Sequence, residues 1–174
     1  MKLALNSSLD KTAVFVAIRD YIRHLSLEVS NCVQDKPWGG YFVINEAQTL
    51  EFITYYFPEF PELSVGKNSC GNRLSPKILV IAPTMRFSWQ YHNRRTELWK
   101  NIGDTVDYAT STTDDPGPIL TLKAGETVQF TTKVRHRLIG LENWGIVAEI
   151  WQHTDPNNPS DENDIVRIAD DFGR

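Results

Sequence analysis

The chain has 174 residues, a size that suits one domain with its own core, and its hydrophobic fraction of 41% excludes a disordered chain. A net charge of -4 gives no electrostatic basis for a nucleic-acid or anionic-membrane partner, and no apolar stretch approaches a membrane span. Two cysteines, Cys32 and Cys70, indicate neither a disulfide framework nor a thiolate metal site. The N-terminus has no signal-peptide pattern, so we expect a cytoplasmic protein.

The first third of the chain is predicted to be mainly helical. Over residues 9–30, apolar residues recur at spacings of three and four, which is typical of an amphipathic helix. Those residues are Phe15, Ile18, Ile22 and Leu25. The glycine pair of KPWGGY marks a break, residues 41–44 form a short strand, and a second helix covers about 46–57. We therefore expect a helical N-terminal segment over 1–35 and a helical insertion near 46–72.

After Gly71 the pattern changes to short strands separated by turn signals such as DDPGP. The stretches that we expect to contain strands are LSPKILVIAP, SWQYHNRR, TELWKNIG, VDYATST, ILTLKAGE, TVQFTT, HRLIGLEN, WGIVAEIWQ and DIVRIADDFGR. By composition, residues 153–164 are a polar surface loop. The pattern predicts a mainly β protein, a sandwich or barrel over 36–174, with a small N-terminal helical extension.

The stretch SWQYHNRRTELW holds a glutamine, a histidine and a glutamate within eight residues. Gln90 and His92 are two apart, so in a strand they point to the same face. His24 lies in the predicted first helix and His153 in the polar loop, which leaves His136 as the natural third donor. Imidazole and carboxylate ligands suit Zn, Fe, Mn, Co or Ni. The predicted ligands of a divalent metal are Gln90, His92, Glu97 and His136. The alternative is a barrel interior whose polar groups hydrogen-bond to one another.

These residues resemble the two sequence motifs of the cupin family. The first motif is H-x-H followed after three or four residues by Glu, and its positions hold Gln90, His92 and Glu97. In the second motif Gly125 and His136 match, whereas Lys133 stands in place of a glycine. The resemblance implies a cupin barrel, that is, a jelly roll or double-stranded β-helix.

A narrower resemblance covers roughly residues 36–44 and 75–174. KPWGGY, SWQYHNRRTELW, RHRLIG and DENDIVRIADDFGR are similar, in the same order, to the cupin domain of type II phosphomannose isomerases. Glutamine at the first ligand position belongs to that family's pattern. No Gly-rich phosphate loop of the family's nucleotidyltransferase domain occurs here, so we expect a stand-alone relative.

The resemblance implies an aldose–ketose isomerase that depends on a divalent metal, with Zn the leading candidate and mannose 6-phosphate to fructose 6-phosphate the leading reaction. A proton would move between C1 and C2 through an enediol, which needs a general base. We expect Glu149 in this role because it alternates with Val147 and Trp151, although an exposed strand carboxylate is the alternative. Other candidates are Lys100, Lys133 and His153. The predicted catalytic residues are Glu149, Arg137 and Lys133.

A substrate phosphate would require cations, and several arginines match family positions. These are Arg95, Arg137, Arg167 and Arg174. We predict that Arg95, Arg137 and Arg174 bind substrate, the alternative for each being a solvated or salt-bridged arginine. The tryptophans are interpreted as barrel core.

Two further functions stay open. One is a non-catalytic cupin that binds a sugar or a sugar nucleotide. The other is a different cupin enzyme, an epimerase or an oxygenase, although the glutamine ligand argues against the His-rich ligation of oxygenases. The expected partner is a small-molecule sugar or sugar phosphate, with no nucleic acid and no membrane. Pairing through strand edges gives a homodimer as the family-level expectation.

Overall fold

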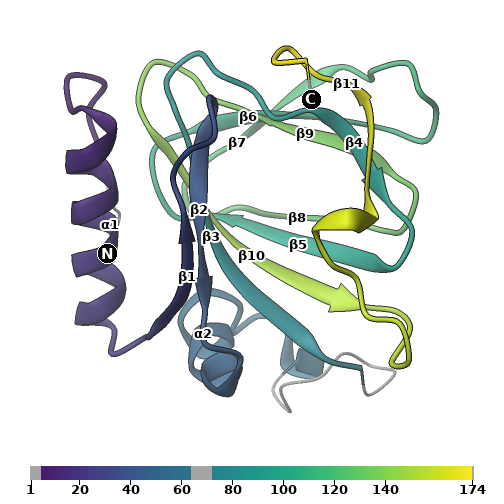
Figure 1. The fold of residues 1–174 in the computed structure, drawn as a ribbon, viewed down its shortest axis with the longest axis horizontal. Helices are drawn as coiled ribbons and strands as arrows, with labels where there is room; N and C mark the ends of the chain where they lie inside the picture. Colours follow the sequence, from purple (N-terminus) through teal and green to yellow (C-terminus); the bar gives the residue numbers. More distant parts are fainter. Residues whose placement is uncertain (1–4, 64–71, 174) are drawn as a thin grey trace.

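The computed structural model describes residues 5–63 and 72–173, and within them two antiparallel sheets face each other (Figure 1). In spatial order, one sheet holds β1 (Val29–Val33), β2 (Gly39–Ile44), β3 (Leu74–Ile81), β10 (Gly145–His153), β5 (Arg95–Asn101) and β8 (Thr127–Phe130). The other holds β11 (Ile165–Ala169), β4 (Trp89–His92), β9 (Arg135–Ile139), β6 (Val106–Ser111) and β7 (Ile119–Leu122). The helical elements are α1 (Lys11–His24), η1 (Glu46–Gln48), α2 (Thr49–Tyr56), η2 (Pro61–Leu63) and η3 (Glu162–Asp164). The predicted mainly β fold with a helical extension is confirmed.

The first helix is shorter than the sequence pattern predicts. It begins after Asp10, whose side chain accepts a hydrogen bond from the Ala13 amide, and it ends at His24. Ser26 has a φ of 58°, a left-handed conformation that stops the helix. Residues 29–33 then form β1, which pairs with β2 at the edge of the six-stranded sheet. The N-terminal segment therefore contributes a strand to the barrel as well as a helix.

Strands β3 and β10 separate two hydrophobic cores. Alternate residues such as Ile78 and Ile150 point out of the barrel and pack with Phe15 and Phe52 of the helices. Leu79 and the other intervening apolar residues point toward the opposite sheet. Figure 1 shows α1 and α2 beside the six-stranded sheet, outside the barrel. Because side chains alternate between the two faces, every second residue of β3 and β10 faces the barrel interior.

The glycines of KPWGGY do not form a break, as the sequence suggested, but are the first two residues of β2. Gly39 has a φ of 137°, and a Cβ there would lie 2.1 Å from the carbonyl oxygen of Val80. This close approach lets the start of β2 pair with the end of β3, at Ile81. A glycine is therefore required for pairing at this position and not for a loop.

We predict that Gly39→Ala lowers the free energy of unfolding by about 3 kcal/mol, because the new methyl group forces β2 away from the backbone of β3. Gly125→Ala is the matched control, since Gly125 also has a positive φ but no atom within 4 Å of an added Cβ. The control should lose only about 1 kcal/mol from backbone strain. Urea unfolding measures both values, and equal losses would contradict the close-approach explanation.

Residues 153–164 form more than the predicted polar surface loop. His153, Ser160 and Asp164 are buried. His153 Nδ1 accepts a hydrogen bond from the Ser160 amide (2.9 Å), and Asp164 accepts hydrogen bonds from the amides of Asn93 (3.1 Å) and Arg94 (2.9 Å). The polar side chains thus satisfy backbone groups and hold the segment against the barrel before it enters β11.

The lowered pKa of His153 predicts how the free energy of unfolding depends on pH. Burial, followed by the charge of Arg73, lowers the pKa of His153 from 6.5 to about 4. The unfolded ring therefore binds a proton at higher pH than the folded ring does, and the free energy of unfolding should fall as the pH is lowered from about 6.5 to about 4. We expect the free energy of unfolding of His153→Gln, measured with urea at a series of pH values, to fall less steeply with decreasing pH than that of the original chain. Parallel profiles would contradict this assignment.

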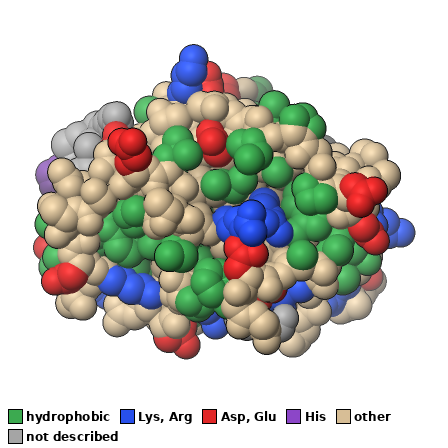
Figure 2. Space-filling model, turned by 90° about the horizontal axis from the view of Figure 1, so that it is seen from above, with side chains coloured by type: hydrophobic (Ala, Val, Ile, Leu, Met, Phe, Trp, Pro, Cys, Tyr) green, Lys and Arg blue, Asp and Glu red, His purple; other side chains and the backbone are tan. Residues whose placement is uncertain are grey.

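The exterior carries charge of both signs. Figure 2, a view from above Figure 1, shows hydrophobic, basic and acidic side chains interspersed over the face, without a patch of a single charge sign. Arg135 and Asp114 form one ion pair between side chains of opposite charge. In the part of the chain that the structure describes, no helix has the length and apolar character needed to cross a membrane.

Candidate metal centre and pocket

Three of the four predicted metal ligands meet between the two sheets. Glu97 lies on β5, His92 ends β4 and His136 lies on β9. The Nε2 atom of His92 is 3.1 Å from Glu97 Oε1, and the Nε2 atom of His136 is 3.1 Å from Glu97 Oε2. All three residues are at most 2% exposed, and their candidate ligand atoms lie within 4.8 Å of one another. This buried His–Glu–His group has the donors and the spacing to hold a metal ion.

The strand pattern explains why these residues converge. Glu97 and Trp99 are on the barrel face of β5, and Gln90 pairs directly with His136 where β4 meets β9. The side chain of Gln90 also faces the barrel interior, and its Oε1 accepts a hydrogen bond from Ser88 Oγ (2.6 Å). Gln90, the fourth predicted ligand, is therefore next to the cluster and partly exposed to the pocket beside it.

The protonation states suit a cation. Burial alone would raise the pKa of Glu97, but the neighbouring His92, Arg95 and His136 hold it well below the usual range. Burial lowers the pKa of His92, which favours a neutral imidazole. A carboxylate and a neutral imidazole are the forms that bind metals.

The hydrogen bond of His136 shows how its ring is oriented toward the candidate metal site. Its Nδ1 lies 3.0 Å from the carbonyl oxygen of Val134, and a carbonyl only accepts, so Nδ1 carries the proton. The Nε2 atom on the other side of the ring then faces Glu97 Oε2 at 3.1 Å. A backbone carbonyl that orients the ring in this way is common around metal-binding histidines.

Arg95 balances the charge of the buried carboxylate. Its Nε donates to Glu97 Oε1 (2.7 Å), its Nη1 donates to Ser160 Oγ (2.8 Å), and its Nη2 lies 3.1 Å from His92 Nε2. The guanidinium also stacks 3.5 Å from the centre of the Trp151 ring. Arg95 lines the pocket, but its charge is balanced by Glu97. These contacts fit a residue that stabilises the cluster better than one that binds a substrate anion.

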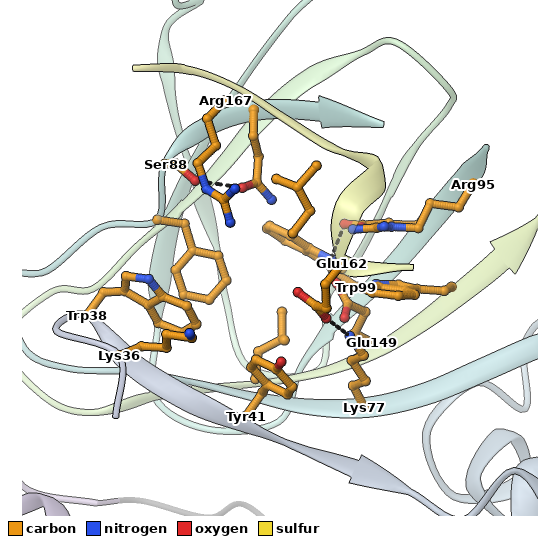
Figure 3. Close-up of a pocket in the computed structure, with 16 residues that line it drawn as sticks. Lys36, Trp38, Tyr41, Lys77, Ser88, Arg95, Trp99, Glu149, Glu162 and Arg167 are labelled. Atoms are coloured by element: carbon orange, nitrogen blue, oxygen red, sulfur yellow. Dashed lines mark hydrogen bonds and ion pairs between the residues drawn. The ribbon is translucent and has the colours of Figure 1, made fainter. Parts of the chain in front are cut away.

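A pocket of about 210 Å³ opens beside the cluster (Figure 3). Gln90, Arg95 and Glu97 form part of its wall, so the buried cluster reaches the pocket through its carboxylate. The wall also contains the rings of several aromatic residues, three of them on strands of the six-stranded sheet. These are Trp38, Tyr41, Phe87, Trp99 and Trp151. The wall thus combines aromatic rings with several charged side chains, and a cavity with convergent polar groups is a candidate small-molecule site.

Glu149, the predicted general base, also lines this pocket. Trp99 Nε1 donates to Glu149 Oε1 (2.8 Å), which fixes the carboxyl group. Burial, reinforced by the negative charge of Glu97, raises the pKa of Glu149 to about 8. Lys77, its direct partner across the β3–β10 ladder, lines the pocket as well, and burial lowers the pKa of its ammonium group. A carboxyl and an amine with shifted pKa values in one cavity are a common feature of proton-transfer sites.

Several predicted site residues lie elsewhere. Lys133 is exposed in a turn with a φ of 64°, the conformation that the cupin glycine supplies, and only its backbone amide contacts His92. Arg137 follows His136 on β9 and therefore points to the other face, where it lies 5.7 Å from the Trp89 ring. Lys100 pairs with Glu59. Neither Lys133 nor Arg137 is among the described residues that line the pocket. Arg174 lies outside the described residues.

Sequence reasoning missed Lys77, Tyr41, Ser88 and Glu162, all of which line the pocket. Lys77 could have been found, because a lysine in the apolar run LSPKILVIAP is unusual. Alternation also places its side chain on the face of the strand opposite to that of Ile78. Glu162 could not, because its position depends on how residues 154–164 return across the barrel. Arg167, one of the arginines that match family positions, lies at the pocket on β11, opposite Gln90 in the ladder.

No family model and no curated protein matches this sequence. Among solved structures, two variants of Bacillus subtilis oxalate decarboxylase match with 13% identity and TM-scores of 0.55, over 80% and 82% of this chain. The chain spans only 30% and 31% of their lengths. A Cupin 2 conserved barrel domain protein from Salinispora arenicola matches with 16% identity and a TM-score of 0.40, over 45% of this chain and 62% of its own.

Identities this low establish the fold and not the reaction. The comparisons give no link to phosphomannose isomerases, so the finer resemblance stays a prediction. The matches to oxalate decarboxylase, together with the two antiparallel sheets, show that the chain has a cupin fold.

We predict that chelator-treated protein binds one divalent ion and that His136→Ala weakens this binding at least ~100-fold, because it removes a ligand from a buried site. Isothermal titration with Zn²⁺ and the visible spectrum with Co²⁺ measure affinity and ligand field. His24→Ala is the control, since His24 is exposed at the end of α1. Failure of Zn, Mn, Fe and Co alike to bind or to raise the melting temperature would contradict a metal centre.

Proposed function

We propose that this chain is a metal-dependent isomerase that interconverts an aldose and a ketose, with a sugar phosphate such as mannose 6-phosphate as the leading substrate. One observation carries the proposal: the carboxylate of the His–Glu–His cluster and the Glu149–Lys77 pair line the same pocket. An aldose–ketose isomerase needs both a site that polarises a carbonyl and a group that transfers a proton between adjacent carbons.

The proposed ligands are His92, Glu97 and His136, with Gln90 as the fourth. A divalent ion bound there would act as a Lewis acid on the sugar carbonyl and hydroxyl oxygens. The raised pKa of Glu149 suits a group that takes the C2 proton of the aldose and returns it to C1 of the enediol at neutral pH. The indole nitrogen of Trp99 holds this carboxyl group in a fixed position.

Three of the four sequence blocks that resemble the isomerases contribute to the pocket wall. Lys36 and Trp38 come from KPWGGY, Gln90 and Glu97 from SWQYHNRRTELW, and Arg167 from the terminal block. Segments far apart in sequence thus contribute to one cavity. Lys36 and Arg167 are more exposed than the cluster, and we propose that they bind the substrate phosphate in place of Arg137.

A non-catalytic sugar-binding protein is the second candidate, and the contacts of Glu97 favour it. Arg95, His92, His136 and Trp99 all lie within 3.1 Å of its carboxylate oxygens. The carboxylate is therefore surrounded by protein groups that balance its charge without a metal ion. Such a protein would retain ligand binding and would show no exchange of sugar protons.

We predict that, with a divalent ion present, the protein removes the C2 proton signal of its substrate in deuterated water and forms the ketose, as followed by proton NMR with a panel of sugars and sugar phosphates. Glu149→Gln should lower this rate by ~10²–10⁴-fold, because the amide cannot accept the proton. Glu142→Gln, at an exposed carboxylate, is the matched control and should retain the rate.

Melting curves must show that both variants fold. Sugar binding without exchange by any panel member would favour the non-catalytic candidate. An exchange rate unchanged by Glu149→Gln would remove Glu149 from the reaction and retain the isomerase.

A further inference from the structure

Lys77 is a cation within an otherwise apolar strand, and the metal cluster does not use it. Its side chain is 6% exposed, and its Nζ lies 3.2 Å from the centre of the Trp151 ring and 4.8 Å from that of Tyr41. The ammonium donates to Glu162 Oε1 (2.7 Å), a carboxylate that is half exposed (Figure 3). Burying a lysine costs free energy that an apolar residue would not, so its presence at the pocket indicates a role there.

The partners of Lys77 and Glu149 hold the two groups in separate positions on the same wall. The two residues are opposite each other in the β3–β10 ladder, where Cβ atoms are about 5 Å apart. Lys77 is bonded to Glu162, whereas Glu149 is bonded to Trp99. An amine and a carboxyl group fixed side by side by different partners are suited to two adjacent atoms of one ligand.

We infer that Lys77 transfers the hydroxyl proton of the substrate while Glu149 transfers the proton on carbon. The inference rests on the proposed isomerase function and adds a second proton-transfer group to it. In the sheet, Glu149 lies between Lys77 of β3 and Trp99 of β5, its direct partners in the two neighbouring strands.

The proposed reaction conserves protons and electrons. Glu149 takes the C2 proton, the C2–H electron pair forms the C1–C2 double bond, and the carbonyl oxygen at C1 takes a proton from the Lys77 ammonium. The enediol then passes its O2 proton to the Lys77 amine as the C2 carbonyl forms, and Glu149 returns its proton to C1. Each group ends in its starting form, so no oxidant, reductant or co-reactant is needed.

The surroundings of Lys77 support this role. Burial lowers its pKa, against the charges of Glu162 and Glu149 and together with that of Arg95, so the ammonium is a stronger acid than an exposed lysine. Glu162 comes from η3, which connects Lys77 to the segment that enters β11.

The test compares Lys77→Met with Lys100→Met in the NMR exchange assay. Lys77→Met should lower turnover by ~10²–10⁴-fold, because methionine keeps the apolar stem and removes the acid. Lys100→Met should stay close to the original rate, since Lys100 pairs with Glu59 away from the pocket. Melting temperature and zinc titration of both variants establish that fold and metal binding are intact.

Two further variants separate proton transfer from a merely electrostatic role. Lys77→Arg keeps the positive charge but is a very weak acid, so it should be as impaired as Lys77→Met. Lys77→Ala should regain activity on addition of methylamine or ethylamine, in proportion to amine concentration. An active Lys77→Arg variant together with no amine rescue of Lys77→Ala would overturn the inference.

The failures of the two proposals can be distinguished. If the original chain turns over a sugar and Lys77→Met does so at a similar rate, this inference alone is overturned. If the original chain exchanges no proton of any panel member, the isomerase proposal is overturned and the role of Lys77 with it.

Discussion

The burial of the Glu97 carboxylate is the constraint on which the site depends. An ionised carboxylate that is 2% exposed must be matched by cations and donors, since the cost of an unmatched buried charge is several kcal/mol. Arg95 and Trp99 supply donors from the same strand, and His92 and His136 approach from the opposite sheet. The carboxylate therefore connects the two sheets, and the pocket lies where they meet.

This arrangement explains why the interior is polar at one end and apolar at the other. Leu138 and Val147 pack between the sheets as an ordinary core, whereas Glu149 and Lys77 face the pocket among aromatic rings. A buried ion network is rarely more stabilising than apolar residues of the same volume. A network that combines a charge-balanced carboxylate with two groups of shifted pKa is therefore better explained by ligand chemistry than by stability.

Much of the fold and part of the candidate site were predictable from the sequence, and the wrong predictions have identifiable causes. Strand periodicity, which is local, predicted the barrel. The choice of His136 as the partner of His92 and Glu97 came from the small number of histidines and from the resemblance to the cupin motifs. Arg137 was assigned to the pocket from the family resemblance, although alternation places it on the face of β9 opposite to that of His136. The roles of Arg95 and Glu162 depend on how residues 154–164 fold back, which composition does not reveal.

The central claim is that the buried cluster holds a divalent ion at the wall of the pocket. The most direct measurement is anomalous diffraction from a crystal grown with Zn²⁺ or Mn²⁺, recorded on both sides of the absorption edge of the metal. The account predicts a peak among His92, Glu97 and His136, with Arg95 moved away from the Nε2 atom of His92. A well-ordered crystal with no peak there, and with the contact between Arg95 and His92 unchanged, would contradict it.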